Sequence, residues 1–165
     1  MTNEQELMSR VAKTVFRLNG QLFILGEGLA SAAGLTGAWW QVLGAILREP
    51  LSVANIAREI GVTRQSVQRV ADLLVGEGLA VFRPNPAHAR SKLLAPTTKG
   101  RDVVRRIAPA HAALADRLAA ELGVDRLRDS LATLERLSVA LGSLIGSADP
   151  VDELPERWVV ASGEP

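Results

Sequence analysis

Two short amphipathic segments separated by a tight turn constrain the fold more than any other feature of this 165-residue chain. Apolar side chains recur at i, i+3, i+4 and i+7, first from Val53 and again from Val67, which is the period of a helix with one buried face. Ser52 and Thr63 stand where the two helices should begin, because their hydroxyl groups can accept hydrogen bonds from the N–H groups of a first turn. A glycine suited to a sharp turn lies between the segments. The pattern predicts a pair of short helices packed on each other.

The second of these helices carries donor-rich side chains on the face that its apolar stripe leaves outside. Side chains of this kind read base edges when the N-terminus of a helix enters the major groove of DNA. An ordinary helix pair with a solvated polar face is the alternative interpretation, and spacing alone does not say which side chain touches a base. The candidate base-reading residues are Arg64, Gln65, Ser66, Gln68 and Arg69.

A β-prone hairpin follows the helix pair directly and favours the DNA-binding interpretation. Its two runs, residues 79–83 and 90–95, flank a turn that contains two prolines. An isolated helix pair has no need of such a hairpin, whereas a winged helix-turn-helix has one. The hairpin adds three basic candidates for DNA contact, which are Arg83, Arg90 and Lys92.

Charge is distributed unevenly along the chain, although the net charge is only +1. Residues 48–106 carry eleven basic and five acidic side chains, whereas residues 107–165 carry five basic and ten acidic ones. The basic block coincides with the helix pair and the hairpin, where contacts to phosphate groups would be needed.

Three longer segments, at about 4–33, 99–122 and 125–145, show apolar seams at alternating spacings of three and four. Such long seams must pack against something equally long, so we expect a second copy of the chain. A further helix, capped by Thr36, should precede the helix pair. The predicted fold class is therefore mainly α with a small β-wing. It comprises a winged helix-turn-helix domain at 35–96, a helical dimerisation region at 1–34 and 97–147, and an acidic, flexible tail at 148–165.

These stretches together resemble the MarR family of bacterial transcription regulators. The resemblance covers roughly residues 11–145 and is carried by LTGAWWQVLGAI at 35–46, the segment 51–79, NPAHARSKL at 85–93 and TTKG at 97–100. It implies a homodimer whose winged domains bind a palindromic operator, usually as a repressor that a small ligand releases.

The wing departs from the family pattern, in which an aspartate stands two residues before an arginine. Here His88 occupies the position of the aspartate, and Arg90 remains as the expected minor-groove side chain. Asp72 matches the family's acidic residue on the second helix of the pair. It could brace Arg90 or another wing base, or it could be solvated.

The resemblance also places a ligand pocket between the long helices and the winged domain. Adjacent residues on a helix point about 100° apart, so Trp39 and Trp40 cannot both face the same core. We favour a core position for Trp40 and for His111, and we expect Trp39 to lie toward the long helices beside Asn19. Aromatic walls without an obvious cation favour an apolar or phenolic ligand. The candidate pocket residues are Phe16, Asn19, Phe23, Trp39, Trp40 and His111.

Several classes of protein are disfavoured by what the sequence lacks. It has no cysteine and two histidines, so neither a thiolate site nor a structural zinc site is expected. No nucleophile elbow, P-loop or metal-ligand cluster is present, which predicts neither an enzyme nor a cofactor. The most apolar early run is too short to span a bilayer, which predicts a cytoplasmic protein. A winged-helix adaptor that binds only other proteins is the remaining alternative, and arginines on both the second helix and the hairpin argue against it.

Overall fold

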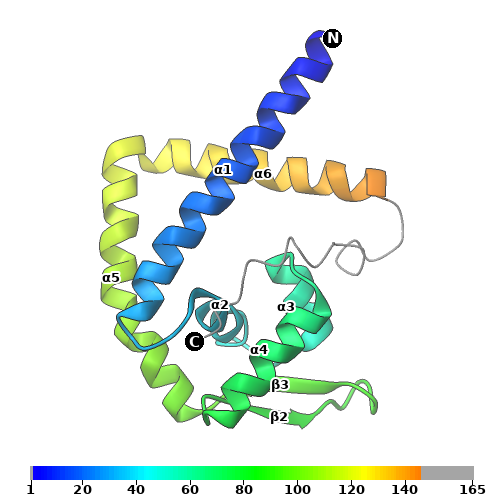
Figure 1. Cartoon of the computed structure of the whole chain (residues 1–165), viewed down its shortest axis with the longest axis vertical. Helices are drawn as coiled ribbons and strands as arrows, with labels where there is room; N and C mark the ends of the chain where they lie inside the picture. Colours follow the sequence, from blue (N-terminus) through cyan, green and yellow to red (C-terminus); the bar gives the residue numbers. More distant parts are fainter. Residues whose placement is uncertain (1, 146–165) are drawn as a thin grey trace.

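The computed structural model describes residues 2–145 and is mainly helical, with one small antiparallel sheet (Figure 1). The predicted tail at 148–165 lies outside the described residues. The elements are α1 (Asn3–Ser31), α2 (Gly37–Ala45), β1 (Leu51–Ser52), α3 (Val53–Ile60), α4 (Arg64–Gly76), β2 (Ala80–Pro84), β3 (Lys92–Pro96), α5 (Thr98–Leu122) and α6 (Val124–Ile145).

Helices begin where the sequence places hydroxyl side chains. Thr36, Ser52, Thr63 and Thr97 each adopt an extended backbone, and each accepts a hydrogen bond from the backbone N–H three residues further on. This contact satisfies one of the N–H groups that a first helical turn leaves without a partner. Gly61 ends α3 with a φ of 79°, a left-handed conformation that glycine adopts without steric cost. The predicted helix pair is confirmed.

The sheet has the strand order β1-β3-β2, with both pairings antiparallel. Its register pairs Leu94 of β3 with Leu51 on one side and with Phe82 on the other. The sequence did not predict β1, because two residues are too few to show an alternating pattern. The second run of the hairpin begins at Lys92 rather than at residue 90, so Arg90 lies in the turn. We call β2, β3 and the turn between them, residues 80–96, the wing.

The hydrophobic core lies where α2, α3 and α4 pack on one another, on the sheet and on the first half of α5. The apolar stripes of α3 and α4 fill it, as their 3.6-residue period predicts. Its largest fully buried side chains are Leu43, Ile46, Ile56, Val67, Leu74, Leu94 and Ile107.

The first turn of α5 is attached to the winged domain by hydrogen bonds to the ends of two other helices. Lys99 Nζ donates to the carbonyl oxygen of Glu77 at 2.8 Å, and Arg101 Nη1 donates to that of Leu47 at 3.0 Å. These cations satisfy carbonyl groups at or just beyond the C-termini of α4 and α2, where positive charge is favoured. The attachment fixes the direction in which α5 leaves the winged domain.

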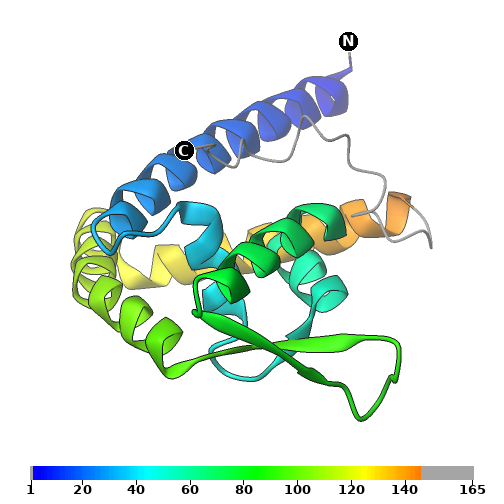
Figure 2. The same ribbon diagram turned by 60° about the horizontal axis from the view of Figure 1, so that its bottom comes forward.

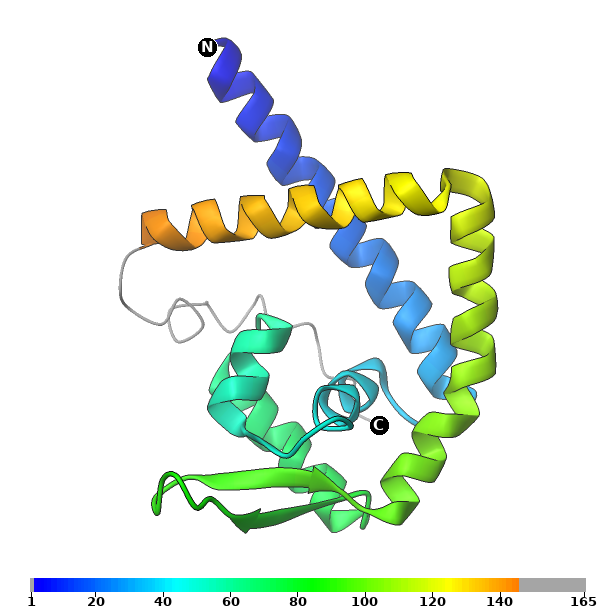
Figure 3. The same ribbon diagram turned by 180° about the vertical axis from the view of Figure 1, so that it is seen from behind.

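The long helices extend away from this core. From the sheet, α5 runs to the far end of the molecule, where α6 turns away from it (Figures 1 and 3). Figure 2 shows α1 and α6 as two separate arms. Ala30 is the one buried residue of α1 among those described, and α6 has none. None of the described helices is long and apolar enough to cross a membrane.

Candidate DNA-binding site

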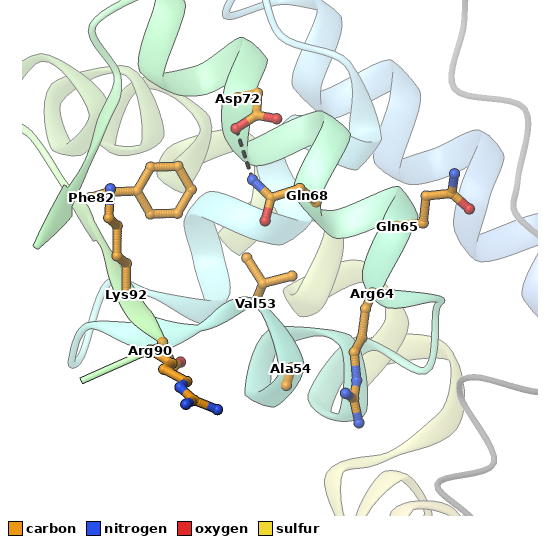
Figure 4. A pocket seen from close by; sticks show the side chains of 10 residues that line it. Val53, Ala54, Arg64, Gln65, Gln68, Asp72, Phe82, Arg90 and Lys92 are labelled. Carbon is orange, nitrogen blue, oxygen red and sulfur yellow. Dashed lines mark hydrogen bonds between the residues drawn. The ribbon is translucent and has the colours of Figure 1, made fainter. Parts of the chain in front are cut away.

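A cleft of about 790 Å³ opens between the N-termini of α3 and α4 and the wing (Figure 4). Three elements that are separate in the sequence therefore meet at one surface. The lining comprises Val53 and Ala54 from α3, Arg64, Gln65, Gln68 and Asp72 from α4, and Phe82, Arg90, Ser91 and Lys92 from the wing.

The N-terminus of α4 is held by a two-way contact between Thr63 and Ser66. The Thr63 hydroxyl accepts from the Ser66 backbone N–H at 3.2 Å and donates to Ser66 Oγ at 2.9 Å. Ser66 is half-buried in this contact, whereas Arg64 and Gln65 of the same turn are exposed. The predicted contact between Ser66 and DNA is untested, and the structure places its hydroxyl at the cap of the helix.

Gln68 and Asp72 are joined one turn further along α4. Gln68 Nε2 donates to Asp72 Oδ1 at 2.8 Å, and both side chains are exposed on the cleft (Figure 4). Among the described residues, no ion pair joins Asp72 to Arg90. The acidic side chain therefore contacts its neighbour on α4 instead of bracing the wing.

The wing presents one of its two faces to the cleft. Successive side chains of a strand point to opposite faces, so Phe82 and Lys92, which line the cleft, leave Arg83 on the other face. The cross-strand partner of Arg83 is Leu93, which shares that far face.

Arg90 lies in the turn of the wing, which is ordered without the aspartate of the family pattern. Asn85 Oδ1 accepts from the Ala87 N–H at 3.0 Å, and the Asn85 carbonyl oxygen accepts from the His88 N–H at 3.3 Å. The Ser91 N–H then donates to the carbonyl oxygen of His88 at 3.0 Å. Side chain-to-backbone contacts of this kind are how asparagine stabilises a turn.

The cleft brings together five of the eight predicted DNA-contacting residues. The other three do not line it: Ser66 lies in the helix cap, Arg69 is exposed on α4 outside the lining, and Arg83 lies on the far face of the wing. The five residues that line the cleft are Arg64, Gln65, Gln68, Arg90 and Lys92.

Sequence reasoning missed several residues of the lining. Val53 and Ala54 reach it because Ser52 begins α3 directly at β1, the strand that the sequence did not reveal. Phe82 could have been found, because strand alternation places it on the same face as the buried Ala80. Ser91 belongs to no periodic pattern, so nothing in the sequence indicated it.

The candidate ligand pocket is only partly assembled in one chain. Trp40 makes an edge-to-face contact with His111 of α5, with ring centroids 5.6 Å apart, and it also lies next to Gly26 of α1. Phe23 is half-buried three residues before Gly26 and so shares its side of α1. Phe16 and Asn19 lie ten and seven residues before Gly26, roughly 15 and 10 Å along the helix.

Two expectations about these side chains are wrong. Trp40, which was expected in the core away from the long helices, contacts His111 of α5, and both tryptophans are half-buried against the core. His111 is exposed and is not a core residue. The sequence predicts that the Trp39 and Trp40 rings point in different directions. It does not predict how α2 is rotated about its axis, which decides which ring faces α1 and α5.

A capped helix whose first turns face a basic hairpin is the arrangement of winged helix-turn-helix DNA-binding proteins. The model of the MarR family matches residues 33–91 of the chain. Protein Rv2011c of Mycobacterium tuberculosis strain H37Rv, which is uncharacterised, is 41% identical over 134 residues, covering 81% of this chain and 94% of its own. The chain belongs to the MarR family of transcription regulators.

Two further relatives are named for regulation of transcription. The transcriptional activatory protein BadR of Rhodopseudomonas palustris is 30% identical over 104 residues, covering 61% of this chain and 59% of its own. The transcriptional repressor CouR, solved bound to a 23-mer DNA duplex, is similar with a TM-score of 0.69 and 27% identity, covering 84% of this chain and 99% of that one. Membership of a family of transcription regulators agrees with the prediction that the chain is not an enzyme.

Proposed function

We propose that the chain is a homodimeric repressor that binds a palindromic operator with its α4 helices and wings, and that a small ligand releases it. The observation that carries this proposal is the cleft between α4 and the wing. It gathers three cations, Arg64, Arg90 and Lys92, and two amides, Gln65 and Gln68, from α4 and the wing. Cations of this kind contact phosphate groups, and glutamine can pair with adenine through two hydrogen bonds.

The shape of α4 supports its entry into a major groove. The groove is about 12 Å wide and admits a helix, and the candidate side chains occupy the first two turns of α4. The N-terminus of a helix also favours negative charge nearby, such as a phosphate group. The wing stands beside α4, so Arg90 would contact the adjoining backbone or minor groove.

Exposed apolar side chains support the homodimer. Among the described residues, all but two of the nineteen exposed large hydrophobic side chains lie on α1, α5 and α6; the exceptions are Leu73 and Val81. A groove of about 480 Å³ also runs along α6, where the Val139 side chain is 75% exposed. Apolar patches of this extent are uncommon on monomers, and a second copy, as the family resemblance implies, would cover them. Residues 1–34 and 97–147 would then form the dimerisation region.

The contact between Trp40 and His111 supports a ligand site between α1, α2 and α5. An aromatic ring that is partly free of the core, next to polar groups, is typical of small-molecule pockets, and an apolar or phenolic ligand suits it. Such a ligand releases DNA only if it binds more tightly to the dimer whose α4 helices do not match successive major grooves. We favour repression because occupancy of the operator is sufficient for it.

Selection from random double-stranded DNA with the purified protein tests the DNA-binding proposal. The expected product is an inverted repeat whose half-sites are centred about 10–10.5 base pairs, or a multiple of that, apart. Binding without an enriched motif would overturn the proposed recognition of an operator, and no binding by the folded protein would overturn the proposal and favour a protein–protein adaptor. Transcription in vitro from a promoter that contains the repeat should fall when the protein is added.

A further inference from the structure

We propose that Asp72 is a positioning residue that fixes the orientation of the Gln68 amide and thereby sets which base pair Gln68 reads. The inference rests on the proposed DNA-binding function and deepens it. It starts from the hydrogen bond between Gln68 Nε2 and Asp72 Oδ1, 2.8 Å long, at the surface of the cleft (Figure 4).

A carboxylate selects one orientation of a neighbouring amide. An ionised aspartate only accepts hydrogen bonds, whereas a glutamine amide has a donating nitrogen and an accepting oxygen. Rotating the Gln68 amide by half a turn would bring its oxygen against the Asp72 carboxylate, with no hydrogen between two acceptors. Asp72 therefore holds the nitrogen of Gln68 toward itself.

The oriented amide keeps the groups that match adenine. One N–H of Nε2 is used by Asp72, which leaves the second N–H and the oxygen Oε1 available. In the major groove adenine presents the N7 acceptor beside the N6 donor, and one N–H with one carbonyl oxygen complements this pair. With its amide fixed before DNA arrives, Gln68 loses less conformational freedom on binding.

The Asp72 carboxylate opposes the charge of the rest of the cleft, which is unfavourable for DNA binding unless Asp72 has a specific function. The other charged residues of the lining, Arg64, Arg90 and Lys92, are all basic. An exposed carboxylate among them repels the phosphate backbone and weakens binding to every DNA sequence. A residue that weakens all binding but orients one reading group increases specificity at the expense of affinity.

Gln65 provides a contrast on the same helix. It also lines the cleft, but its side chain makes no hydrogen bond within the described part of the chain, and it points away from Gln68 (Figure 4). Its amide is not oriented before DNA binds. The discrimination that depends on Asp72 should therefore be confined to the base pair beneath Gln68.

The test uses full-length protein and the operator selected by the wild type. Fluorescence anisotropy measures the Kd of wild type, Asp72→Asn, Gln68→Ala and the double variant for duplexes that carry each of the four base pairs at each half-site position. Asparagine can donate or accept, so it no longer selects one orientation of Gln68. Glu59→Gln on α3, exposed and outside the lining, is the control that removes the same charge from the same domain.

We expect Asp72→Asn to bind all sequences more tightly, but to lose about tenfold of its adenine preference at one symmetry-related pair of positions. Adding Asp72→Asn to the Gln68→Ala variant should leave the base preferences of that variant unaltered, because Asp72 would act on base preference only through Gln68. Glu59→Gln should keep the wild-type preferences. Thermal melting should be close to wild type for Asp72→Asn, because Asp72 is exposed.

Three results would overturn the inference. A uniform rise in affinity for Asp72→Asn, with every base preference retained, would make Asp72 a purely electrostatic residue. Loss of preference that persists without Gln68 would show that Asp72 acts through another group. A wild type without sequence preference would overturn the proposed function itself, which distinguishes the two failures.

Discussion

The two arginines of the wing lie on different sides of it, and this determines what each can contribute to DNA binding. Arg90 lies in the turn of the wing and lines the cleft, whereas Arg83 lies on the opposite face of the same hairpin. Phosphate contacts contribute to affinity for every sequence, and each phosphate that a cation neutralises releases a counterion from the DNA, which adds to the salt dependence of binding. Two arginines on one hairpin therefore provide a matched comparison.

Arg90→Ala is expected to weaken binding to operator and to random DNA by similar factors. If each Arg90 neutralises one phosphate, the slope of log K against log salt should become shallower by about 0.9 per contact, or nearly two for a dimer. Anisotropy titrations between low and moderate salt measure both quantities. Arg83→Ala should change the slope little; a larger loss for Arg83→Ala than for Arg90→Ala would mean that the far face of the wing meets the DNA.

Trp40→Ala is expected to abolish the response to ligand while ligand-free operator binding persists. The reason is that Trp40 lies between the winged domain and α1 and α5, where a ligand could alter their relation. Displacement from operator by a panel of substituted phenols measures the response, and Trp39→Ala is the matched control. If Trp40→Ala lost stability and operator binding together, Trp40 would be a core residue and the pocket would have no support.

Residue types and patterns predicted most of the cleft, and the remainder depended on geometry that a sequence does not contain. Arg64, Gln65 and Gln68 were placed correctly because a capped N-terminus and an apolar stripe fix the outward face of a helix. The hydrogen bond of Asp72 could not be chosen beforehand, since both Gln68 on its own helix and Arg90 on the wing were within plausible reach. Arg83 was included for its charge, although strand alternation could have set it apart.

Most helix boundaries were predictable to within one or two residues, because hydroxyl caps and glycine turns are local signals; α2 ends at Ala45, several residues before the Glu49-Pro50 stop that the sequence suggests. The long helices and the helix pair follow from such signals, and so does the hairpin. The strand β1 does not, because its two residues form a strand only by pairing with β3. The rotation of α2, which brings Trp40 to His111 of α5, depends on packing between elements and is not visible in the spacing of residues in the sequence.

The junction between α4 and α5 depends on a close approach that only glycine permits. A Cβ on Gly100 would overlap the carbonyl oxygen of Leu79, which is backbone and cannot move aside easily. Gly100→Ala is therefore expected to destabilise the fold by about 1–3 kcal/mol, as overpacking does. Chemical denaturation followed by circular dichroism measures the free energy of unfolding.

Gly76→Ala is the matched control for this prediction. It places the same methyl group in α4, where nothing lies within 4 Å of the added carbon. Alanine is favoured over glycine in a helix by up to about 1 kcal/mol, so this variant should be as stable as the wild type or more so. Equal destabilisation by both substitutions would show that the approach at Gly100 is not what limits the junction.

The whole molecule has a buried core in the winged domain, whereas α1 buries only Ala30 among its described residues and α6 buries none. Light scattering at micromolar concentration should therefore give about twice the 17.6 kDa mass of the chain. Leu134→Glu on α6 should shift the mass toward the monomer, because it would place a charge in an apolar interface. Leu73→Glu, at a similarly exposed position on α4, should remain dimeric; a wild type that is a stable, soluble monomer would contradict the proposed dimer.

The absence of cysteine from the chain allows the position of DNA to be mapped directly. Single cysteines at Gln65 on α4, at Ala89 in the wing and at Ala120 near the far end of α5 would each carry an iron chelate that cleaves nearby DNA. On the selected operator, the chelate on α4 should cut within each half-site at positions related by the operator's two-fold symmetry. The chelate in the wing should cut beside those positions, and the one on α5 should not cut. Cleavage from Ala120 equal to that from Gln65, or no cleavage from either Gln65 or Ala89 in a complex that forms, would show that DNA does not bind in the cleft between α4 and the wing.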